Sequence, residues 1–525
     1  MVTRSLLAAL VCGLFLFGCG PSTATPPEGA PNILIISIDT LRADRLGVYG
    51  NDDWATTPTP AMDALADRGV VFDMATVPRG QTRPAIAAML TGKFPITSGV
   101  RENGMFLEKH HRTFFEHLLE GGYQTGVFIA NFERGTMGSE WAYRGAQQGV
   151  DGHGNEGRKA GPESVLQEQW DDRVERATHE FLRQTDPSRP FAAWVHFYDV
   201  HKPYNPPEGF DRYGQYADMP LALSKVDSTT GKRLHDHLDA ISLGDRFVGP
   251  DELRRILGLY DGTVTATDVR VERILTTLQD MGKGDETTII LTSDHGEELF
   301  DRNRYFYHGN SIHLGTLRVP LIIAGPGIPA GGRTDVPVMN LDLAPTILEM
   351  AGIATPETME GKSLLPILSG RSSAPPRPVS FYEWQDLIYG ASDGTHFYIH
   401  NPEHVHPQKP PYWETGQSYA IACFEGYDLS TDPLQINNAF ETLDPVQLVK
   451  RQGLPEDYRP LRAALFEWLA DPSHERKLSW PGLTGPIRQA VQAEAERMAA
   501  LGYVGMEAQG RDHLRLHDCA PPKER

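Results

Sequence analysis

The sequence predicts an α/β fold with a mixed, mostly parallel central sheet flanked by helices, followed by a small C-terminal α+β subdomain. Nearly continuous apolar runs at 32–38, 191–198 and 287–293 are typical of buried parallel strands. From about residue 378 the pattern changes to short segments separated by turn residues, which indicates antiparallel strands. A chain of 525 residues is long enough for one large domain and a smaller one.

The elements expected between these strands follow from their local patterns. Residues 60–72 begin with a helix pattern that has proline at its start and is closed by Gly69, and a short strand then runs to Phe72. Residues 251–281 have the spacing of a long amphipathic helix. The remaining expectations are a glycine-rich surface loop at 145–165, an insertion at 203–246 forming a lid or specificity element, and helices at 460–469 and 487–501.

Composition excludes one class of partner. The formal net charge is −20, and this acidic excess argues against nucleic acid. The apolar share of 40% and the charged share of 22% are ordinary for a soluble globular protein.

The first residues have the pattern of an export signal. Arg4 precedes an apolar run at 6–17 that is too short to span a bilayer. The run ends in Leu-Phe-Gly-Cys19, which resembles a bacterial lipobox, so we expect lipidation of Cys19 and a site in the cell envelope. The alternative is a plain secretory peptide that is cleaved a few residues later. Cys423 and Cys519 could form one bridge, which the sequence leaves open.

Polar residues follow each of the three central strands. Asp39 ends the first, Asp199 and His201 follow the second, and Asp294-His295 follow the third. Open α/β sheets bind ligands at the carboxyl ends of their central strands, which makes Asp39 a candidate ligand, although Asp39 alone could cap a helix. The adjacent Asp294 and His295 offer one carboxylate oxygen and one imidazole at a strand end. His196, inside the second strand, is interpreted as a hydrogen-bonded core histidine.

Thr82 stands where a helix is expected to begin, because Pro84 suits a first turn and the following Ala-Ile-Ala-Ala-Met-Leu is a strong helix former. Such a position can hold an oxyanion or activate a hydroxyl, and its plainer interpretation is an N-cap. Asp39, Thr82, Asp294 and His295 together offer oxygens and one imidazole, which suit a divalent cation. The sequence does not decide whether this cation is Ca, Mn, Mg or Zn, or whether the site holds one ion or two.

The run at 80–92 resembles the sulfatase signature, with Thr82 at the nucleophile position, Pro84 on its proline and Ile86 on its arginine. The stretches at 36–44, 98–104, 198–204, 294–297 and 318–326 also resemble motifs of the sulfatase branch of the alkaline phosphatase superfamily. The resemblance covers most of the chain. It implies the superfamily fold and makes Asp39, Thr82, Asp294 and His295 metal ligands.

The resemblance also implies roles for residues around this centre. His201 corresponds to the histidine beside the leaving group, and His308 either assists it or completes a second metal site with Asp199 or His201. Arg101 either contacts substrate or forms a surface ion pair. Ala130 stands where sulfatases carry a lysine, and Asn131 is the nearest polar replacement.

The departures from the signature decide the expected substrate. A sulfatase whose nucleophile matures to formylglycine needs Cys or Ser there, and Thr82 cannot be converted in that way. Superfamily branches that handle phosphate esters use threonine. The resemblance therefore implies a metal-dependent hydrolase or transferase with Thr82 as its metal-bound nucleophile. Its expected substrate is a phosphate ester, or a sulfate ester, of a small molecule, a glycan or a lipid. The alternatives are a sulfatase with an atypical nucleophile and an inactive substrate-binding lipoprotein.

The expected segments are a signal peptide at 1–18, a tether at 19–31, a catalytic domain at 32–375, an antiparallel subdomain at 376–470 and a helical or polar tail at 471–525.

Overall fold

The computed structural model describes residues 25–50, 58–103, 105, 107–129, 152–154, 170–211, 238, 249–301, 306–309, 311–384, 388–401, 424–440, 454–471 and 474. The expectations for Cys19, Asn131, the Cys423–Cys519 pair and the helix at 487–501 lie outside these residues, as does most of the insertion at 203–246. Among the helices that the structure does describe, none combines the length and apolar character needed to cross a bilayer.

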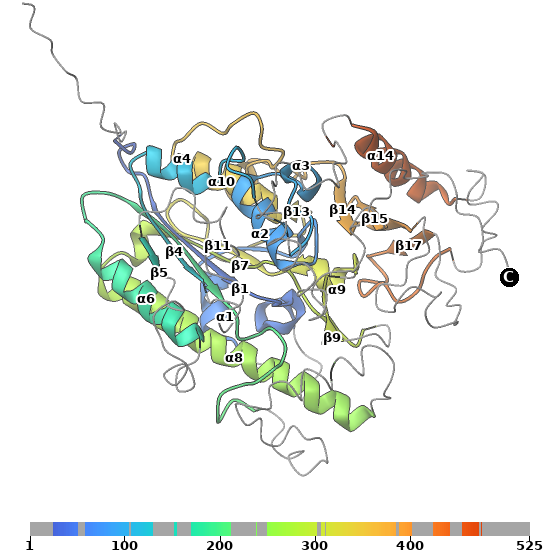
Figure 1. Ribbon diagram of the computed structural model, residues 1–525, viewed down its shortest axis with the longest axis horizontal. Coiled ribbons are helices and arrows are strands. Elements are labelled where there is room, and N and C mark those ends of the chain that lie inside the picture. Colours follow the sequence, from blue (N-terminus) through green and yellow to red (C-terminus); the bar gives the residue numbers. More distant parts are fainter. Residues whose placement is uncertain are drawn as a thin grey trace, which may run out of the picture.

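A central sheet of eight strands organises the chain (Figure 1). Strand β1 (Asn32–Ile38) lies between β6 (Phe191–Phe197) and β7 (Thr287–Ser293) and is parallel to both. Strand β11 is antiparallel to its neighbours β7 and β2, whereas every other pairing in this sheet is parallel. The expected mixed, mostly parallel sheet is therefore confirmed. Its other strands are β4 (Gln124–Ile129), β5 (Gly152–Gly154), β2 (Gly69–Phe72), β11 (Leu321–Ala324) and β12 (Gly332–Thr334).

Helices cover both faces of the sheet because side chains of a buried parallel strand alternate between two cores. Ile33 and Ile35 of β1 belong to one apolar cluster, and Leu34 and Ile36 belong to the other. Figure 1 shows helices α2 (Thr82–Thr91), α4 (Phe114–Glu120) and α10 (Leu343–Met350) over the first face. Helices α1 (Pro60–Asp67), α6 (Trp170–Gln184) and α8 (Pro250–Asp280) cover the second.

A four-stranded antiparallel sheet forms the small C-terminal unit. Its strands β14 (Ser380–Trp384), β15 (Ile388–Ser392), β16 (His396–His400) and β17 (Phe424–Asp428) pair in chain order. Helix α14 (Arg459–Ala470) packs on this sheet through Leu461 and Leu465. The remaining short elements are β3 (Ala75–Thr76), α3 (Pro95–Ser98), β8 (Glu298–Leu299), β9 (Phe306–Tyr307), α9 (Leu314–Leu317), β10 (Arg318–Val319), β13 (Val338–Met339) and α11 (Leu365–Leu368).

The glycine-rich stretch at 145–165 is expected to be a surface loop, but part of it is a strand. Residues Gly152–Gly154 form β5, which pairs in parallel with β4 at the edge of the central sheet. A three-residue strand that contains two glycines has no alternating pattern to reveal it. Backbone pairing with β4 defines this strand.

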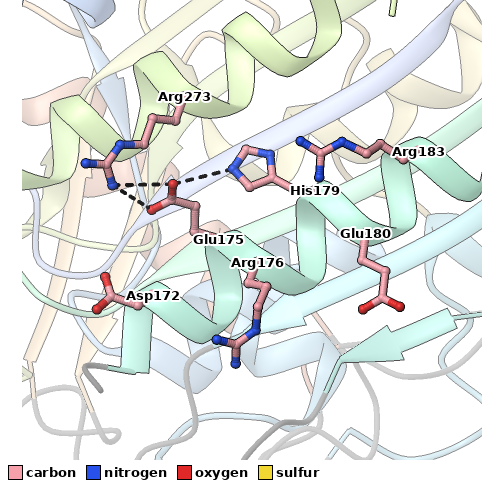
Figure 2. A pocket seen from close by; sticks show the side chains of 7 residues that line it. All are labelled: Asp172, Glu175, Arg176, His179, Glu180, Arg183 and Arg273. Carbon is pink, nitrogen blue, oxygen red and sulfur yellow. Dashed lines mark hydrogen bonds and ion pairs between the residues drawn. The ribbon is translucent and has the colours of Figure 1, made fainter. Parts of the chain in front are cut away.

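Helices α6 and α8 are joined by charged side chains that line a shallow cavity of about 330 Å³ (Figure 2). Glu175 of α6 lies 3.3 Å from Arg273 of α8 and 3.4 Å from His179, one turn further along α6. None of the predicted catalytic residues lines this cavity, so it is a feature of the helical layer.

Asp268 of α8 fixes the start of α1. Its carboxylate accepts the amide hydrogens of Met62 at 2.9 Å and of Ala61 at 3.1 Å, two of the amides that a helix leaves without partners. Asp268 therefore shapes helix packing. Burial raises the pKa of Asp268 to about 6.

We expect the substitution Asp268→Asn to remove a pH-dependent part of the stability. The folded protein holds this proton more tightly than the unfolded chain, so the carboxyl stabilises the fold most below about pH 4, and this contribution is lost as pH rises through 6. Between pH 4 and 7 the wild type should lose up to about 3 kcal/mol relative to the variant in urea unfolding. Asp280→Asn, at the exposed end of α8, is the control. If the free energy of unfolding changed with pH in the same way in D268N and in the wild type, the expectation would be contradicted.

Candidate active site

The register of the central strands brings two aspartates together. Ile38 of β1 lies opposite Phe197 of β6 and opposite Ser293 of β7. Asp39 and Asp294 are the next residues on their strands, so both leave the sheet at the same edge. The amide of Asp39 still donates to the carbonyl oxygen of Phe197 at 2.8 Å, which fixes this position. Alternation along β1 and β7 turns both side chains toward the face covered by α2.

The two carboxylates are buried without enough donors. Asp39 is 0% exposed, and neither of its oxygens has a hydrogen-bond partner. One oxygen of Asp294 accepts the amide of His295 at 2.9 Å, and the other has no partner. Burial, followed by the charge of Asp294, raises the pKa of Asp39 well above its ordinary value. This pair therefore requires positive charge from another source.

Thr82 and His295 complete the group. The Nδ1 atom of His295 lies 2.8 Å from the carbonyl oxygen of Gly296, which can only accept, so the ring proton lies on Nδ1. The Nε2 atom then accepts the hydroxyl hydrogen of Thr82 at 3.2 Å. It also lies 3.7 Å from Asp39 Oδ1 and 3.4 Å from Asp294 Oδ2. The four residues of the predicted metal set are therefore neighbours.

These side chains fit a divalent cation. Among the described residues, one group of three potential ligands converges, with one atom each from Asp39, His196 and Asp294 lying within 4.8 Å of one another. Several of the oxygens there have no partner, as a cation would require. Carboxylate, hydroxyl and imidazole groups are ligands of divalent metals of intermediate hardness.

His196 does not match its interpretation as a satisfied core histidine. Its Nδ1 atom lies 2.8 Å from Ser37 Oγ, but its Nε2 atom is buried without a hydrogen-bond partner, 3.8 Å from Asp39 Oδ2. No strand pattern could have shown this, because the neighbouring strand supplies Asp39.

Two further histidines extend from His295 across the site. The ring centres of His295 and His308 are 4.5 Å apart, and those of His308 and His201 are 4.9 Å apart. Glu297, which sequence reasoning missed, accepts a hydrogen bond from His308 at 3.1 Å. Burial raises the pKa of Glu297 to about 7, against the effect of the buried Lys202.

His201 is held in one orientation. Its Nδ1 atom donates to the carbonyl oxygen of Lys202 at 2.6 Å, which directs Nε2 to the other side of the ring. Burial, and then the neighbouring His308, lower the pKa of His201 well below its ordinary value. The imidazole is therefore neutral near pH 7 in the absence of substrate.

Asp199 belongs to a different cluster. Its carboxylate lies 3.2 Å from Arg270 of α8, and its amide donates to Asp171 at 2.9 Å. Burial raises the pKa of Asp199 to about 6. No second group of metal-ligand type that joins Asp199, His201 and His308 is found in the described part of the chain. A second metal site there stays a prediction without geometric support.

Arg101 forms a buried ion pair with Glu383 of β14. Arg79, two residues before Gln81, lies 2.5 Å from Glu102 and donates to the carbonyl oxygen of Glu383 at 3.3 Å. These arginines thus connect the loops beside Thr82 to the C-terminal sheet. A substrate contact for Arg101 stays a prediction.

The N-terminus of α2 offers fewer amides than expected. The helix begins at Thr82, as predicted, but the amide of Arg83 donates to Asn103 at 3.0 Å and Pro84 has none. Anion binding by these amides is therefore not supported. The Thr82 hydroxyl lies instead beside the imidazole of His295, 3.2 Å from its Nε2 atom.

Tyr260 of α8 supports the turn after β1, a role that the sequence did not reveal. Its hydroxyl donates to the carbonyl oxygen of Thr40 at 2.7 Å and accepts the amide of Arg42 at 3.1 Å. Thr40 has a φ of 57°, which is unfavourable for a β-branched residue and must be imposed by its neighbours. The turn fixes the direction of the preceding Asp39.

We expect Tyr260→Phe to lower both stability and activity. The substitution leaves one buried carbonyl and one amide without a partner, which costs about 1–3 kcal/mol and shows as a lower Tm. Activity should fall further than stability explains, because Asp39 loses its support. Tyr123→Phe is the matched control, since the hydroxyl of Tyr123 bonds to the carbonyl oxygen of Pro31 at the other end of β1. Equal activity of the two variants would contradict the role of Tyr260.

Comparisons with known proteins place the chain in a family. The sulfatase family model matches residues 31–353, and the model of the C-terminal part of N-sulphoglucosamine sulphohydrolase matches residues 296–453. The N-acetylglucosamine-6-O-sulfatase of Bacteroides thetaiotaomicron is 24% identical over 488 residues, covering 78% of this chain and 82% of that protein. The choline-sulfatase of Rhizobium meliloti is 27% identical over 480 residues, covering 84% and 87%.

A solved structure shows the same fold. The phosphonate monoester hydrolase of Agrobacterium radiobacter superposes with a TM-score of 0.60 at 22% identity, covering 84% of this chain and 94% of that one. The sulfatase family model matches more than half of the 525 residues. The chain therefore belongs to the sulfatase family, within the alkaline phosphatase superfamily.

Proposed function

We propose that this sulfatase-family hydrolase cleaves a phosphate ester, with the hydroxyl of Thr82 as the nucleophile. The observation that carries the proposal is the position of Thr82 Oγ1, 3.2 Å from His295 Nε2 and beside two buried carboxylates. A threonine hydroxyl needs no maturation, whereas a formylglycine nucleophile must be made from Cys or Ser. The acceptor is water in a hydrolase and an alcohol in a transferase, and the same first step serves both.

For a phosphate monoester, Thr82 first releases its hydroxyl proton to solvent, and its Oγ1 atom forms a bond to phosphorus while the bond from phosphorus to the ester oxygen breaks. The ester oxygen leaves with a proton from the His201–His308 pair. In the second step water attacks phosphorus and returns a proton to this pair, the bond to Thr82 Oγ1 breaks, and inorganic phosphate is released. A divalent cation held by Asp39, Asp294, His295 and Thr82 would lower the pKa of the hydroxyl and offset negative charge on the transferred group.

The leaving oxygen takes its proton from the His201–His308 pair. His201 is neutral in the absence of substrate, and the negative charge of a bound ester favours its protonated form. Glu297, hydrogen-bonded to His308, stabilises positive charge on this pair. The Nδ1 atom of His201 is held by the carbonyl oxygen of Lys202, so Nε2 is the atom that donates.

A sulfate ester is the second candidate. The relatives include an N-acetylglucosamine-6-O-sulfatase and a choline-sulfatase, so sulfate monoesters of a sugar or a small alcohol suit the family. The phosphonate monoester hydrolase shares only the fold, but that fold accommodates cleavage at phosphorus. Export to the cell envelope and a lipid anchor at Cys19 belong to the same proposal, which places the enzyme outside the cytoplasm.

We expect Thr82→Ala to reduce kcat on the order of 10⁴-fold or more, because the variant cannot form the covalent intermediate. The assay uses nitrophenyl esters of phosphate, a phosphodiester, a phosphonate and sulfate. Thr91→Ala is the matched control, since it removes a buried hydroxyl from the other end of α2, where Thr91 donates only to the carbonyl oxygen of Ala87 at 2.7 Å. Unchanged turnover in T82A would refute the assignment.

The covalent intermediate distinguishes the two ester classes. Acid quenching during turnover should leave a phosphoryl group on the peptide that contains Thr82, identified by accurate mass and fragmentation. A sulfuryl group at Thr82 would support the sulfate candidate instead. Modification of neither kind, with turnover still dependent on Thr82, would contradict a covalent mechanism.

A further inference from the structure

The strand beside β1 contributes a histidine to the same group of acidic side chains. His196 of β6 lies directly opposite Ser37 of β1, two residues before Asp39. Alternation along β1 and β6 turns Ser37, Asp39 and His196 to the face that α2 covers, where Trp194 also lies. The strand register therefore places the histidine on the same face of the sheet as Asp39.

We propose that His196 is a further ligand of the divalent cation, with Nε2 as the ligating atom. This inference rests on the proposed metal-dependent function and adds one imidazole to Asp39, Thr82, Asp294 and His295. Nothing in the resemblance to sulfatases pointed to His196, and its expected role was packing in the core.

The first argument is convergence of atoms without partners. The Nε2 atom of His196, both oxygens of Asp39 and one oxygen of Asp294 are buried and have no hydrogen-bond partner. One ligand atom from each residue lies within 4.8 Å of the others. A single cation would satisfy all these atoms at once, whereas leaving each of them unpaired would cost free energy separately.

The second argument is the separation between pairs of atoms. His196 Nε2 lies 3.8 Å from Asp39 Oδ2, which is too long for a hydrogen bond. It is comparable to the 3.7 Å between His295 Nε2 and Asp39 Oδ1. Two ligands that are each about 2.1 Å from a shared metal lie at most about 4.2 Å apart, so both separations fit.

The third argument is the support behind the ring. Ser37 Oγ lies 2.8 Å from Nδ1 of His196 and accepts the indole hydrogen of Trp194 at 2.7 Å. The oxygen of Ser37 has two lone pairs, so it can accept from Nδ1 as well. Histidines that ligate metals commonly donate their other ring hydrogen to such a partner. Trp194 and His196 are 0% and 1% exposed, so the arrangement is closed to solvent.

A ligand set with two imidazoles favours particular metals. Three oxygens and two nitrogens suit Zn²⁺, Mn²⁺, Fe²⁺ or Co²⁺, whereas Ca²⁺ and Mg²⁺ prefer oxygen ligands throughout. We therefore expect the protein to bind a transition metal more tightly than Ca²⁺.

The test counts the imidazoles that ligate the metal and measures the affinity of the protein for the metal. Neither measurement requires catalytic turnover. Metal-free full-length protein is loaded with Cu²⁺, and electron spin-echo spectroscopy should detect two ligating imidazoles in the wild type and one in His196→Ala. The Kd for Zn²⁺, from competition with a chelator, should rise at least about 100-fold in H196A. His400→Ala is the control, because His400 is an equally buried histidine in the C-terminal sheet.

A different outcome would overturn the proposal. If Ser37 donates to Nδ1, the hydrogen of His196 lies on Nε2 and points at Asp39, and the ring orients that carboxylate without contacting the metal. The wild type would then show one imidazole, and H196A would leave that count unchanged. His196→Gln is used if H196A fails to fold, as judged by the Tm of the metal-free protein. Neither readout involves catalysis, so the two proposals can fail separately. If the wild type shows two ligating imidazoles but the T82A variant is active, the proposed function is refuted and His196 is still a metal ligand.

Discussion

Two carboxylates forced together in a dry environment are the constraint on which the site depends. Strands β1 and β7 are parallel and in register, so Asp39 and Asp294, which follow them, lie next to each other. Neither oxygen of Asp39 finds a donor, and burial penalises its ionised form. A protein without use for a cation there would be expected to carry neutral residues at these positions. The arrangement is costly to the fold unless positive charge is supplied.

The surrounding structure maintains this costly arrangement. Tyr260 holds the turn after Asp39 from α8, and the hydroxyl of Ser293 lies 2.6 Å from the carbonyl oxygen of Ile38 and 3.1 Å from the amide of Leu41. Helix α2, which covers the face of the central sheet opposite to α8, brings Thr82 to the same site. The site thus lies where both helical layers and three strands meet, and a rigid scaffold of this kind would position the proposed nucleophile, Thr82.

Much of the fold could be predicted from the sequence, because long buried strands and amphipathic helices have clear patterns. The strands beginning at Asn32, Phe191 and Thr287 and the helix ending at Asp280 lie close to their expected bounds. The edge strand at Gly152–Gly154 had no such pattern. Its pairing with β4 is a tertiary effect.

The site could be predicted only where its residues lie in local motifs. Thr82, Asp39 and the Asp294-His295 pair follow strands or begin a helix, and the structure brings them together. His196, Glu297 and Tyr260 gain their importance from partners far along the chain, so no local pattern distinguishes them from core residues. Asp199 also follows a strand and was expected as a possible ligand of a second metal. Arg270 lies 3.2 Å from its carboxylate, and that ligand role stays a prediction.

Crystallography at the absorption edge of the bound metal tests the central claim most directly. The account predicts an anomalous peak within coordination distance of Asp39, Asp294, His295 and Thr82 in protein that has not been exposed to chelators. A crystal structure of active enzyme in which these carboxylates bind no cation, even after soaking with transition metals, would contradict it.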